Sequence, residues 1–279
     1  MLDDAQRIRI FHFLGLIALV VAGEAIFTLP YHIVRFFRPT FIEVFQITNT
    51  QIGQMQGTYG LVAMVSYFLG GPLADRFPPK YLIITALLTT SLGGLYFLTI
   101  PGLLGLHLLY AFWGCSTILL FWSALIKATR AWGSLSEQGR AFGFLEAGRG
   151  LFAAVLSSLA FLILAFALPE QLENLDGMAR LQALQKIIGV YVFATVLAAI
   201  LVYLFLDSEP ADETLDALQL PMRERLATVF SNRLLWPQML IVVSAYVGYK
   251  GVDNYVLYAV QGYGMNEVDA AGISTTSAW

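Results

Sequence analysis

Long apolar runs separated by short polar breaks dominate the chain. A helix needs about 20 apolar residues to cross a bilayer, because hydrocarbon offers no partner to an unpaired backbone group. Seven runs come close to that length or exceed it: residues 13–37, 52–73, 81–100, 104–126, 141–168, 187–206 and 235–260. An eighth begins near Ala270 and reaches only Trp279, so we expect the chain to end inside a membrane segment. The pattern predicts an all-α integral membrane protein.

The composition agrees with a membrane protein and excludes several other classes. Of the 279 residues, 58% are hydrophobic and 13% are charged, whereas soluble domains have about 45–50% and about 25%. The net charge of −3 argues against a nucleic-acid partner, and the single Cys115 excludes a disulfide within the chain. The three histidines are scattered, and the sequence has neither a phosphate-binding loop nor a Ser, His and Asp arrangement. We therefore expect no metal site, no cofactor and no enzymatic activity.

The basic residues predict the orientation of the chain in the membrane. With the N-terminus in the cytoplasm, the cytoplasmic side receives Arg7, Arg9, Arg76, Lys80, Lys127, Arg130, Arg140, Arg223, Arg225 and Arg233. The opposite side receives only Arg35, Arg38, Arg180 and Lys186. Lysine and arginine are enriched in cytoplasmic loops, so this distribution predicts a cytoplasmic N-terminus.

The spacing of the spans predicts two halves joined by a linker. Residues 1–206 form a six-span bundle, residues 207–233 a cytoplasmic linker with a short amphipathic helix near 221–230, and residues 234–279 the start of a second bundle. The linker opens with a run of acidic residues between Asp207 and Asp216. These features are also typical of a solvated linker with an amphipathic surface helix and no further role. Span two and the eighth segment both start with a capping residue three positions before a glycine, which is a weak internal repeat.

Small residues gather on one face of two spans. They are Gly53, Gly57 and Gly60 in span two, and Gly139, Gly143, Ala147, Gly150 and Ala154 in span five. Small residues let helices approach closely, either within one bundle or against helices of the other half.

The loop between spans two and three carries the most specific motif. It contains Gly70-Gly71-Pro72-Leu73-Ala74-Asp75-Arg76, followed by Lys80. This combination resembles the signature of the major facilitator superfamily, whose members have two six-helix bundles. The resemblance implies that the chain corresponds to about the first seven and a half of twelve helices. It also implies that Gly71, Asp75, Arg76 and Lys80 belong to a gating loop whose aspartate steadies the outward-facing state. Phe77-Pro78-Pro79 departs from the usual pattern and thins the basic cluster.

A second stretch runs from Trp122 through Lys127, Arg130 and Trp132 to Glu137, Arg140 and Gly143. It is similar to the region between helices four and five of the organophosphate and organic-anion transporters within that superfamily. We add Arg130, Glu137 and Arg140 to the predicted gating set. The alternative is that they only tether a cytoplasmic loop.

Several charged residues lie inside predicted spans, where each costs on the order of 2.5–3.5 kcal/mol unless it has a partner or a water-filled cavity. They are Glu24, Lys127, Glu146, Arg149, Lys250 and Asp253. Glu146 and Arg149, like Lys250 and Asp253, are three positions apart and can neutralise each other on one helix face. Such pairs serve either as structural locks or as part of a site.

Span seven concentrates polar residues in its middle. Residues 246–255 include Tyr249, Lys250, Asp253 and Asn254 and two glycines, and span one has Glu24, Pro30 and Tyr31. Pro30 should kink its helix because it lacks a backbone donor. The resemblance implies that spans one, four and seven line a central cavity. We therefore predict a substrate cavity containing Glu24, Tyr31, Lys127, Tyr249, Lys250, Asp253 and Asn254, in which Lys250 contacts an anionic group.

These observations predict a secondary transporter that moves a small, anionic organic solute across the bacterial inner (plasma) membrane by alternating access. A proton or ion is the candidate coupling partner, with Glu24 as its carrier; alternatively Glu24 only bonds a neighbouring helix. We expect a monomer when full length, in contact with the lipid bilayer. Two alternatives stay open: a transporter of neutral sugars or drugs, and a seven-helix receptor or sensor.

Overall fold

The computed structural model describes residues 4–132, 137–167, 177–207 and 222–276, and within these ranges the chain forms helices and no strands. Most of the acidic part of the expected linker, the end of the eighth segment and Ser134 of the second motif lie outside the described residues. The helices of the first six expected spans are α1 (Asp4–Phe27), η1 (Thr28–His32), α2 (Ile33–Phe36), α3 (Arg38–Phe45), α4 (Asn49–Arg76), α5 (Pro79–Phe97), α6 (Leu103–Cys115), η2 (Ser116–Trp122), α7 (Ser123–Trp132), α8 (Gln138–Ala167) and α9 (Gly177–Phe205). They are followed by α10 (Met222–Ser231), α11 (Leu235–Lys250), η5 (Gly251–Asn254), α12 (Tyr255–Tyr263) and α13 (Glu267–Thr276).

Local sequence signals explain where α4 begins and ends. Thr48 and Gln51 form a capping box, in which the Thr48 hydroxyl oxygen accepts the Gln51 N–H and the Gln51 side chain accepts the Thr48 N–H. The helix ends at Arg76, and Pro79 occupies the first turn of α5, where a missing N–H costs nothing. Gly70–Arg76 of the motif therefore form the last turns of α4, and Lys80 lies in the first turn of α5.

In the part of the chain that the structure describes, five helical stretches are long and apolar enough to cross a membrane: Ile10–Phe36, Pro79–Phe97, Leu103–Trp132, Gln138–Phe166 and Gly177–Phe205. They correspond to the expected spans one, three, four, five and six. The expected spans two and seven, which form α4 and the series α11, η5 and α12, do not meet the same criterion within the described residues. Seven spans thus stay a prediction, and five are supported by length and hydropathy. The expected short helix near 221–230 is present as α10.

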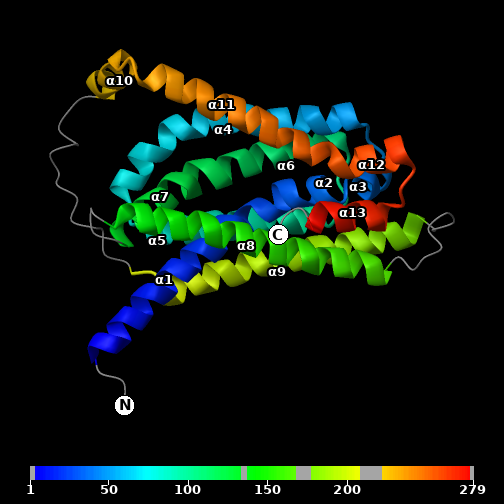
Figure 1. Ribbon diagram of the computed structural model, residues 1–279, viewed down its shortest axis with the longest axis horizontal. Coiled ribbons are helices and arrows are strands. Elements are labelled where there is room, and N and C mark those ends of the chain that lie inside the picture. Colours follow the sequence, from blue (N-terminus) through cyan, green and yellow to red (C-terminus); the bar gives the residue numbers. More distant parts are fainter. Residues whose placement is uncertain (1–3, 133–136, 168–176, 208–221, 277–279) are drawn as a thin grey trace.

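The helices of residues 4–205 pack side by side with roughly aligned axes (Figure 1). α1 packs against α8 and α9, α4 against α6 and η2, and α5 against α9 and η2. We call the end of this bundle at which α1 begins the proximal end, and the end where α3 and α13 lie the distal end. Two groups of buried apolar residues fill the interior. One contains Phe36, Phe41, Phe97 and Trp113, and the other contains Ile83, Phe121 and Leu125.

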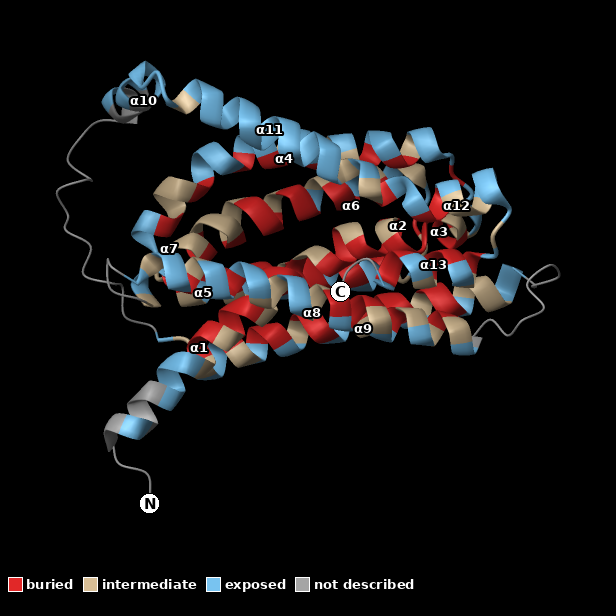
Figure 2. Ribbon diagram, in the orientation of Figure 1, coloured by how far each residue is buried: buried red, intermediate tan, exposed pale blue. Residues whose placement is uncertain are grey.

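The C-terminal elements contact the bundle mainly toward the distal end. There, α12 packs on α3, η5 on α2, and α13 on both α2 and α8. In contrast, α11 has no buried residue and is exposed along nearly its whole length (Figure 2). The division of the chain into a six-span half and the start of another stays a prediction, but the two parts meet at one end.

Candidate functional site

Two π-helical segments interrupt the first and fourth expected spans. η1 contains Pro30, which has no N–H to donate to the preceding turn, and the helix continues here with π-type rather than α-type bonding. η2 is the corresponding segment in the fourth span. Single-turn π segments are frequent at functional sites because they redirect side chains. The structure thus shows a local change of helix type at Pro30, and the kink expected there stays a prediction.

Aromatic rings from spans one, two and four meet beside these segments. The Phe27 ring centroid lies 6.0 Å from that of Trp122, and the Tyr31 ring centroid lies 5.1 Å from that of Tyr59. The Tyr59 hydroxyl is 2.6 Å from that of Thr117 on η2. Phe27, Tyr31 and Trp122 are each only partly buried, so we treat these three rings as one surface, the aromatic shelf.

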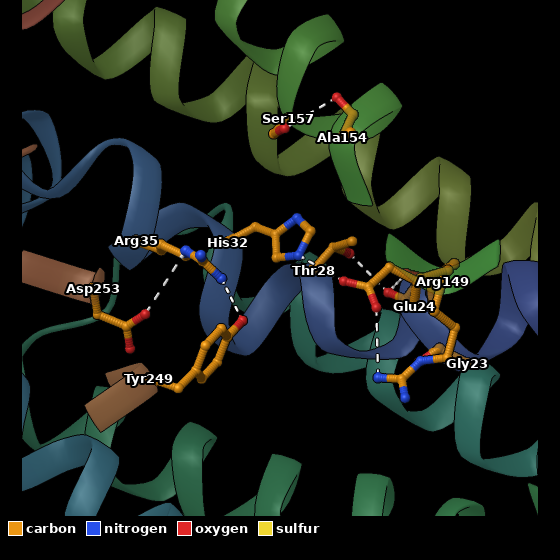
Figure 3. A network of polar contacts seen from close by, with 12 residues as sticks. Gly23, Glu24, Thr28, His32, Arg35, Arg149, Ala154, Ser157, Tyr249 and Asp253 are labelled. Atoms are coloured by element: carbon orange, nitrogen blue, oxygen red, sulfur yellow. Dashed lines mark hydrogen bonds and ion pairs between the residues drawn. The ribbon is translucent and has the colours of Figure 1, made fainter. Parts of the chain in front are cut away.

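Glu24 is the centre of a buried polar network, the Glu24 network (Figure 3). One carboxylate oxygen lies 2.9 Å from Nε2 of His32, two turns further along the same span. The other lies 3.5 Å from Arg149 of α8. Glu24 is 9% exposed and His32 is 5% exposed. The carboxylate is thus held by two basic side chains, one of which comes from another helix.

Arg149 has further partners that fix its position. Its Nε donates to the carbonyl oxygen of Gly23 at 3.0 Å, and its Nη1 lies 3.0 Å from both oxygens of Glu146. Its guanidinium carbon lies 5.9 Å from the centroid of Phe27 and 5.6 Å from that of Trp122. The Glu146 and Arg149 pair expected in span five is present, but it is only part of a larger arrangement that includes Glu24.

A second group of charges joins span one to span seven, and we call it the Asp253 cluster. Arg35 of α2 donates to the Tyr249 hydroxyl at 2.5 Å, and its Nε lies 3.9 Å from Asp253 (Figure 3). Lys250 forms an ion pair with the same Asp253, whose side chain is buried. The Lys250 Nζ also lies 4.7 Å from the ring centroid of Tyr31. The expected pair of Lys250 and Asp253 is present, and Arg35 joins it.

Arg38 extends this cluster at the start of α3. Its guanidinium donates to the side-chain oxygen of Asn49 at 2.9 Å and to that of Asn254. Arg38 is 4% exposed, and burial lowers the pKa of its guanidinium, an effect opposed by the charge of Asp253. Two arginines and one lysine therefore lie near a single carboxylate.

The aromatic shelf lies between the two polar groups. Arg149 of the Glu24 network contacts the Phe27 and Trp122 rings, while Lys250 of the Asp253 cluster contacts Tyr31. Cations over aromatic faces are attracted by the ring quadrupole. Of the seven predicted cavity residues, Glu24, Tyr31, Tyr249, Lys250, Asp253 and Asn254 belong to these contiguous groups.

Lys127 lies elsewhere. Its Nζ donates to the carbonyl oxygen of Ala74 at 2.8 Å, one residue before Asp75. An ammonium at the last turn of a helix satisfies a carbonyl that lacks an intrahelical partner. The structure thus places Lys127 beside the loop motif rather than beside the aromatic shelf, and its cavity role stays a prediction.

The predicted gating residues occupy the proximal end. A Cβ added at Gly71 would have no atom within 4 Å, while Asp75 and Arg76 are exposed. Lys80 lies 5.3 Å from the ring centroid of Tyr203. Arg130, Glu137 and Arg140 are exposed as well, and Arg140 is 3.9 Å from Glu137. Apart from Glu137, these residues lie in helices beside the connections from α4 to α5 and from α7 to α8, and a gating role for the set stays a prediction.

A sequence profile of the Major Facilitator Superfamily matches residues 13–278. The chain belongs to the major facilitator superfamily. This superfamily generally consists of transporters rather than enzymes, so membership supports membrane transport and, with the apolar helices, makes the chain a multi-pass membrane protein. Transport is accordingly favoured over a seven-helix receptor.

Three relatives show how far the similarity extends. Inner membrane protein YihN of Escherichia coli is 34% identical over 145 residues, which cover 52% of this chain and 34% of the relative. Inner membrane protein YqcE of the same organism is 26% identical over 229 residues, or 80% of this chain and 51% of the relative. A Mycoplasma pneumoniae protein, the uncharacterized protein MG294 homolog, is 23% identical over 277 residues, or 92% and 57%. The chain thus spans between about a third and somewhat over half of the length of these relatives.

Sequence reasoning misses several residues that this facilitator brings together. By sequence alone His32 is one of several polar residues of span one that are not paired with one another, and Arg149 has only its helical neighbour as a partner. Arg35 and Arg38 count as loop charges at the end of span one. The one available signal is the i, i+8 spacing of Glu24 and His32, which places them near one face of a helix, but the π segment between them makes that signal weak.

Within the part of the chain that the structure describes, no group of three or more His, Cys, Asp or Glu residues could hold a metal ion.

Proposed function

We propose that this facilitator is a secondary transporter of a small organic anion in the bacterial inner membrane, with its N-terminus in the cytoplasm. The observation that carries the proposal is the Asp253 cluster, in which Arg35, Arg38 and Lys250 lie near one carboxylate. Three cations and one anion leave an excess of positive charge in a partly buried place. A site of this kind raises the local concentration of anions and favours their binding.

Lys250 is the proposed anion contact. Its side chain is 29% exposed, compared with 9% for Asp253, so the ammonium is the more accessible member of the pair. It also lies at the edge of the aromatic shelf, through Tyr31. An incoming carboxylate, sulfonate or phosphate can replace Asp253 as the partner of Lys250 and Arg35, because both cations already bind an oxygen anion there.

The arrangement of the helices supports alternating access with this site between the two halves. The C-terminal elements contact the bundle mainly toward the distal end, and the proximal part of α11 lies exposed. With a cytoplasmic N-terminus, this corresponds to a state that is closed toward the outside. The names of the two Escherichia coli relatives support the inner membrane as the location.

Glu24 is the proposed coupling residue for a proton or ion. Its carboxylate is shared between His32 and Arg149, and both partners come from parts of the chain that line the aromatic shelf. A buried carboxylate that is balanced by two basic partners must be balanced again when one of them moves, and a coupling proton or cation can supply that charge.

The test is uptake by proteoliposomes of a panel of sugar phosphates, sulfonates and carboxylates, with neutral sugars as the comparison. We expect Lys250→Ala to raise KM for the transported anion at least about tenfold, equal to the loss of about 1.4 kcal/mol of binding. Lys250→Arg, which keeps the charge, should retain most uptake. Lys186→Ala serves as the control because Lys186 is exposed on α9 and belongs to neither the predicted cavity nor the predicted gating set. Transport of neutral sugars alone, or an unchanged KM in Lys250→Ala, would contradict the proposal.

A further inference from the structure

Glu267, the first residue of α13, has its carboxylate buried at the distal end between three elements. One oxygen accepts the backbone N–H of Thr40 on α3 at 2.8 Å. The other accepts from Nη1 of Arg180 on α9 at 3.1 Å. The residue is 4% exposed. A single side chain therefore connects the C-terminal elements to two helices of the bundle.

Arg180 is shared between Glu267 and a second carboxylate, that of Glu43. Nη1 of Arg180 also lies 2.9 Å from Glu43, whose side chain is 52% exposed. One guanidinium thus faces two carboxylates, one in solvent and one buried. Burial raises the pKa of Glu267; the hydrogen bond from Thr40 and the charge of Arg180 lower it in part, and the charge of Glu43 raises it further.

The remaining neighbours do not add a compensating charge. α8 presents the Phe161 ring to α13, 3.4 Å from a Cβ that would be added at Gly272. The titratable side chains of α12 are Tyr255, Tyr258 and Tyr263. Arg35 of α2 is engaged by Tyr249 and Asp253, and Arg38 of α3 binds Asn49 and Asn254. On α13 itself Asp269 is exposed and adds negative charge. The net charge of the group around Glu267 is therefore negative.

We propose that Glu267 is a proton-binding site whose occupancy is linked to closure of the distal end. The contacts of Glu267 with Thr40 and Arg180 exist only while α13 stays packed on α2 and α8, which keeps this side chain within reach of α3 and α9. When α13 moves away, water surrounds the carboxylate. The closed state then binds the proton more tightly than the open state, and by thermodynamic linkage the proton favours closure.

The sign of the effect follows from the direction of the pKa shift. Because the pKa of Glu267 is raised in the closed state above its ordinary value of 4.5, protonation stabilises that state. The stabilisation is complete below the ordinary value and disappears as the pH rises through the raised value. Each unit by which the pKa of Glu267 differs between the closed and open states changes the ratio of closed to open molecules by up to about tenfold. With a cytoplasmic N-terminus, the relevant pH is that of the external medium.

This inference rests on the alternating access of the proposed function, and it is tested without a transported solute. In a Cys115→Ser background, Ala271→Cys places a reporter on α13 that is buried in the closed state. Gly102→Cys is the control, because Gly102 is exposed in the distal loop between α5 and α6 and has open space around it. The measured quantity is the labelling rate of Ala271→Cys divided by that of Gly102→Cys, both with a membrane-impermeant thiol reagent. This ratio removes the intrinsic pH dependence of the thiol reaction. Thr275→Cys, also buried, is a second reporter if Ala271→Cys does not fold.

We expect the ratio to fall as the pH is lowered toward 4.5, the ordinary pKa of a glutamate. Glu267→Gln, which resembles the protonated side chain, should hold the ratio low at every pH. Glu43→Gln leaves Arg180 to Glu267 alone and should move the transition to lower pH. A Glu267→Gln variant that keeps the pH dependence, or that labels faster than the parent protein, would overturn the inference.

The two proposals fail in different ways. If the ratio changes with a transported anion but not with pH, the proton site is wrong and transport stands. If the ratio responds to no anion and no pH, the distal end does not open, and alternating access itself is contradicted.

Discussion

Arg149 of α8 lies 3.5 Å from the carboxylate of Glu24 on α1, while its Nε donates to the carbonyl oxygen of the preceding Gly23. One side chain thus joins the first and fifth expected spans at two adjacent points. The approach is close, because a Cβ added at Gly23 would lie 2.9 Å from Cδ of Arg149. A charge inside a membrane protein requires such a partner.

The two carboxylates that contact Arg149 should differ in their contribution to stability. Glu24 has a 12% exposed side chain, whereas that of Glu146 is 61% exposed. Glu24→Gln leaves Arg149 without a buried counter-charge and His32 without its carboxylate partner, so we expect a loss of about 3–5 kcal/mol in the free energy of unfolding. Glu146→Gln, the matched control, should cost about 1 kcal/mol or less. Unfolding of the purified protein in detergent measures both, and equal losses would refute the assignment.

Lys127 allows a decision between a cavity role and a structural role. Because its Nζ satisfies the carbonyl of Ala74, we expect Lys127→Met to lower the free energy of unfolding by about 1–3 kcal/mol. KM for the transported anion should stay unchanged. Lys186→Met, at an exposed position on α9 outside both predicted sets, should alter neither quantity. A raised KM with unchanged stability would instead place Lys127 in the cavity.

Asp253 should compete with the transported anion for Lys250 and Arg35. Asp253→Asn removes the competing charge but keeps the size of the side chain, so we expect KM for the anion to fall by roughly tenfold. Asp269→Asn removes an exposed carboxylate at the same end and is the control. Uptake kinetics in proteoliposomes measure both variants. A higher KM in Asp253→Asn would show that Asp253 organises the site rather than competing with the solute.

Two glycines of neighbouring helices should respond in opposite ways to alanine. A Cβ at Gly114 would lie 2.6 Å from the backbone oxygen of Tyr59, so Gly114→Ala must separate α4 from α6 and should cost about 1–3 kcal/mol. Gly60 has nothing within 4 Å. Gly60→Ala should therefore be neutral or stabilise α4 by up to about 1 kcal/mol. Thermal unfolding in detergent compares them, and a similar loss in both would contradict this packing.

The small-residue faces of spans two and five show a limit of predicting helix contacts from residue spacing. Gly53, Gly57 and Gly60, like Gly139, Gly143 and Gly150, have no neighbour within 4 Å of an added Cβ. The close contacts in the described residues occur instead at other glycines, among them Gly93, Gly94 and Gly114. Spacing indicates that a helix face is small, but it does not indicate which helix the face meets.

Other parts of the site could be anticipated only within single helices. The spacing of three residues placed Glu146 near Arg149 and Lys250 near Asp253, and both contacts are present. The contacts of Arg149 with Glu24 and of Arg35 with Asp253 join residues far apart in sequence. No periodicity relates such residues, because the packing of helices determines which faces meet.

The sequence by itself determined that this chain is a helical membrane protein and, through the motif around Asp75, to which superfamily it belongs. Both conclusions depend on local properties: the length of apolar runs, the residues that break them, and a short motif. The tertiary structure decided how the intramembrane charges are neutralised, that Lys127 lies beside Ala74, and that Glu267 reaches Thr40 and Arg180. The physical reason is that a buried charge is stabilised by whatever partner the fold brings within a few ångströms, and that distance is set by the packing of whole helices.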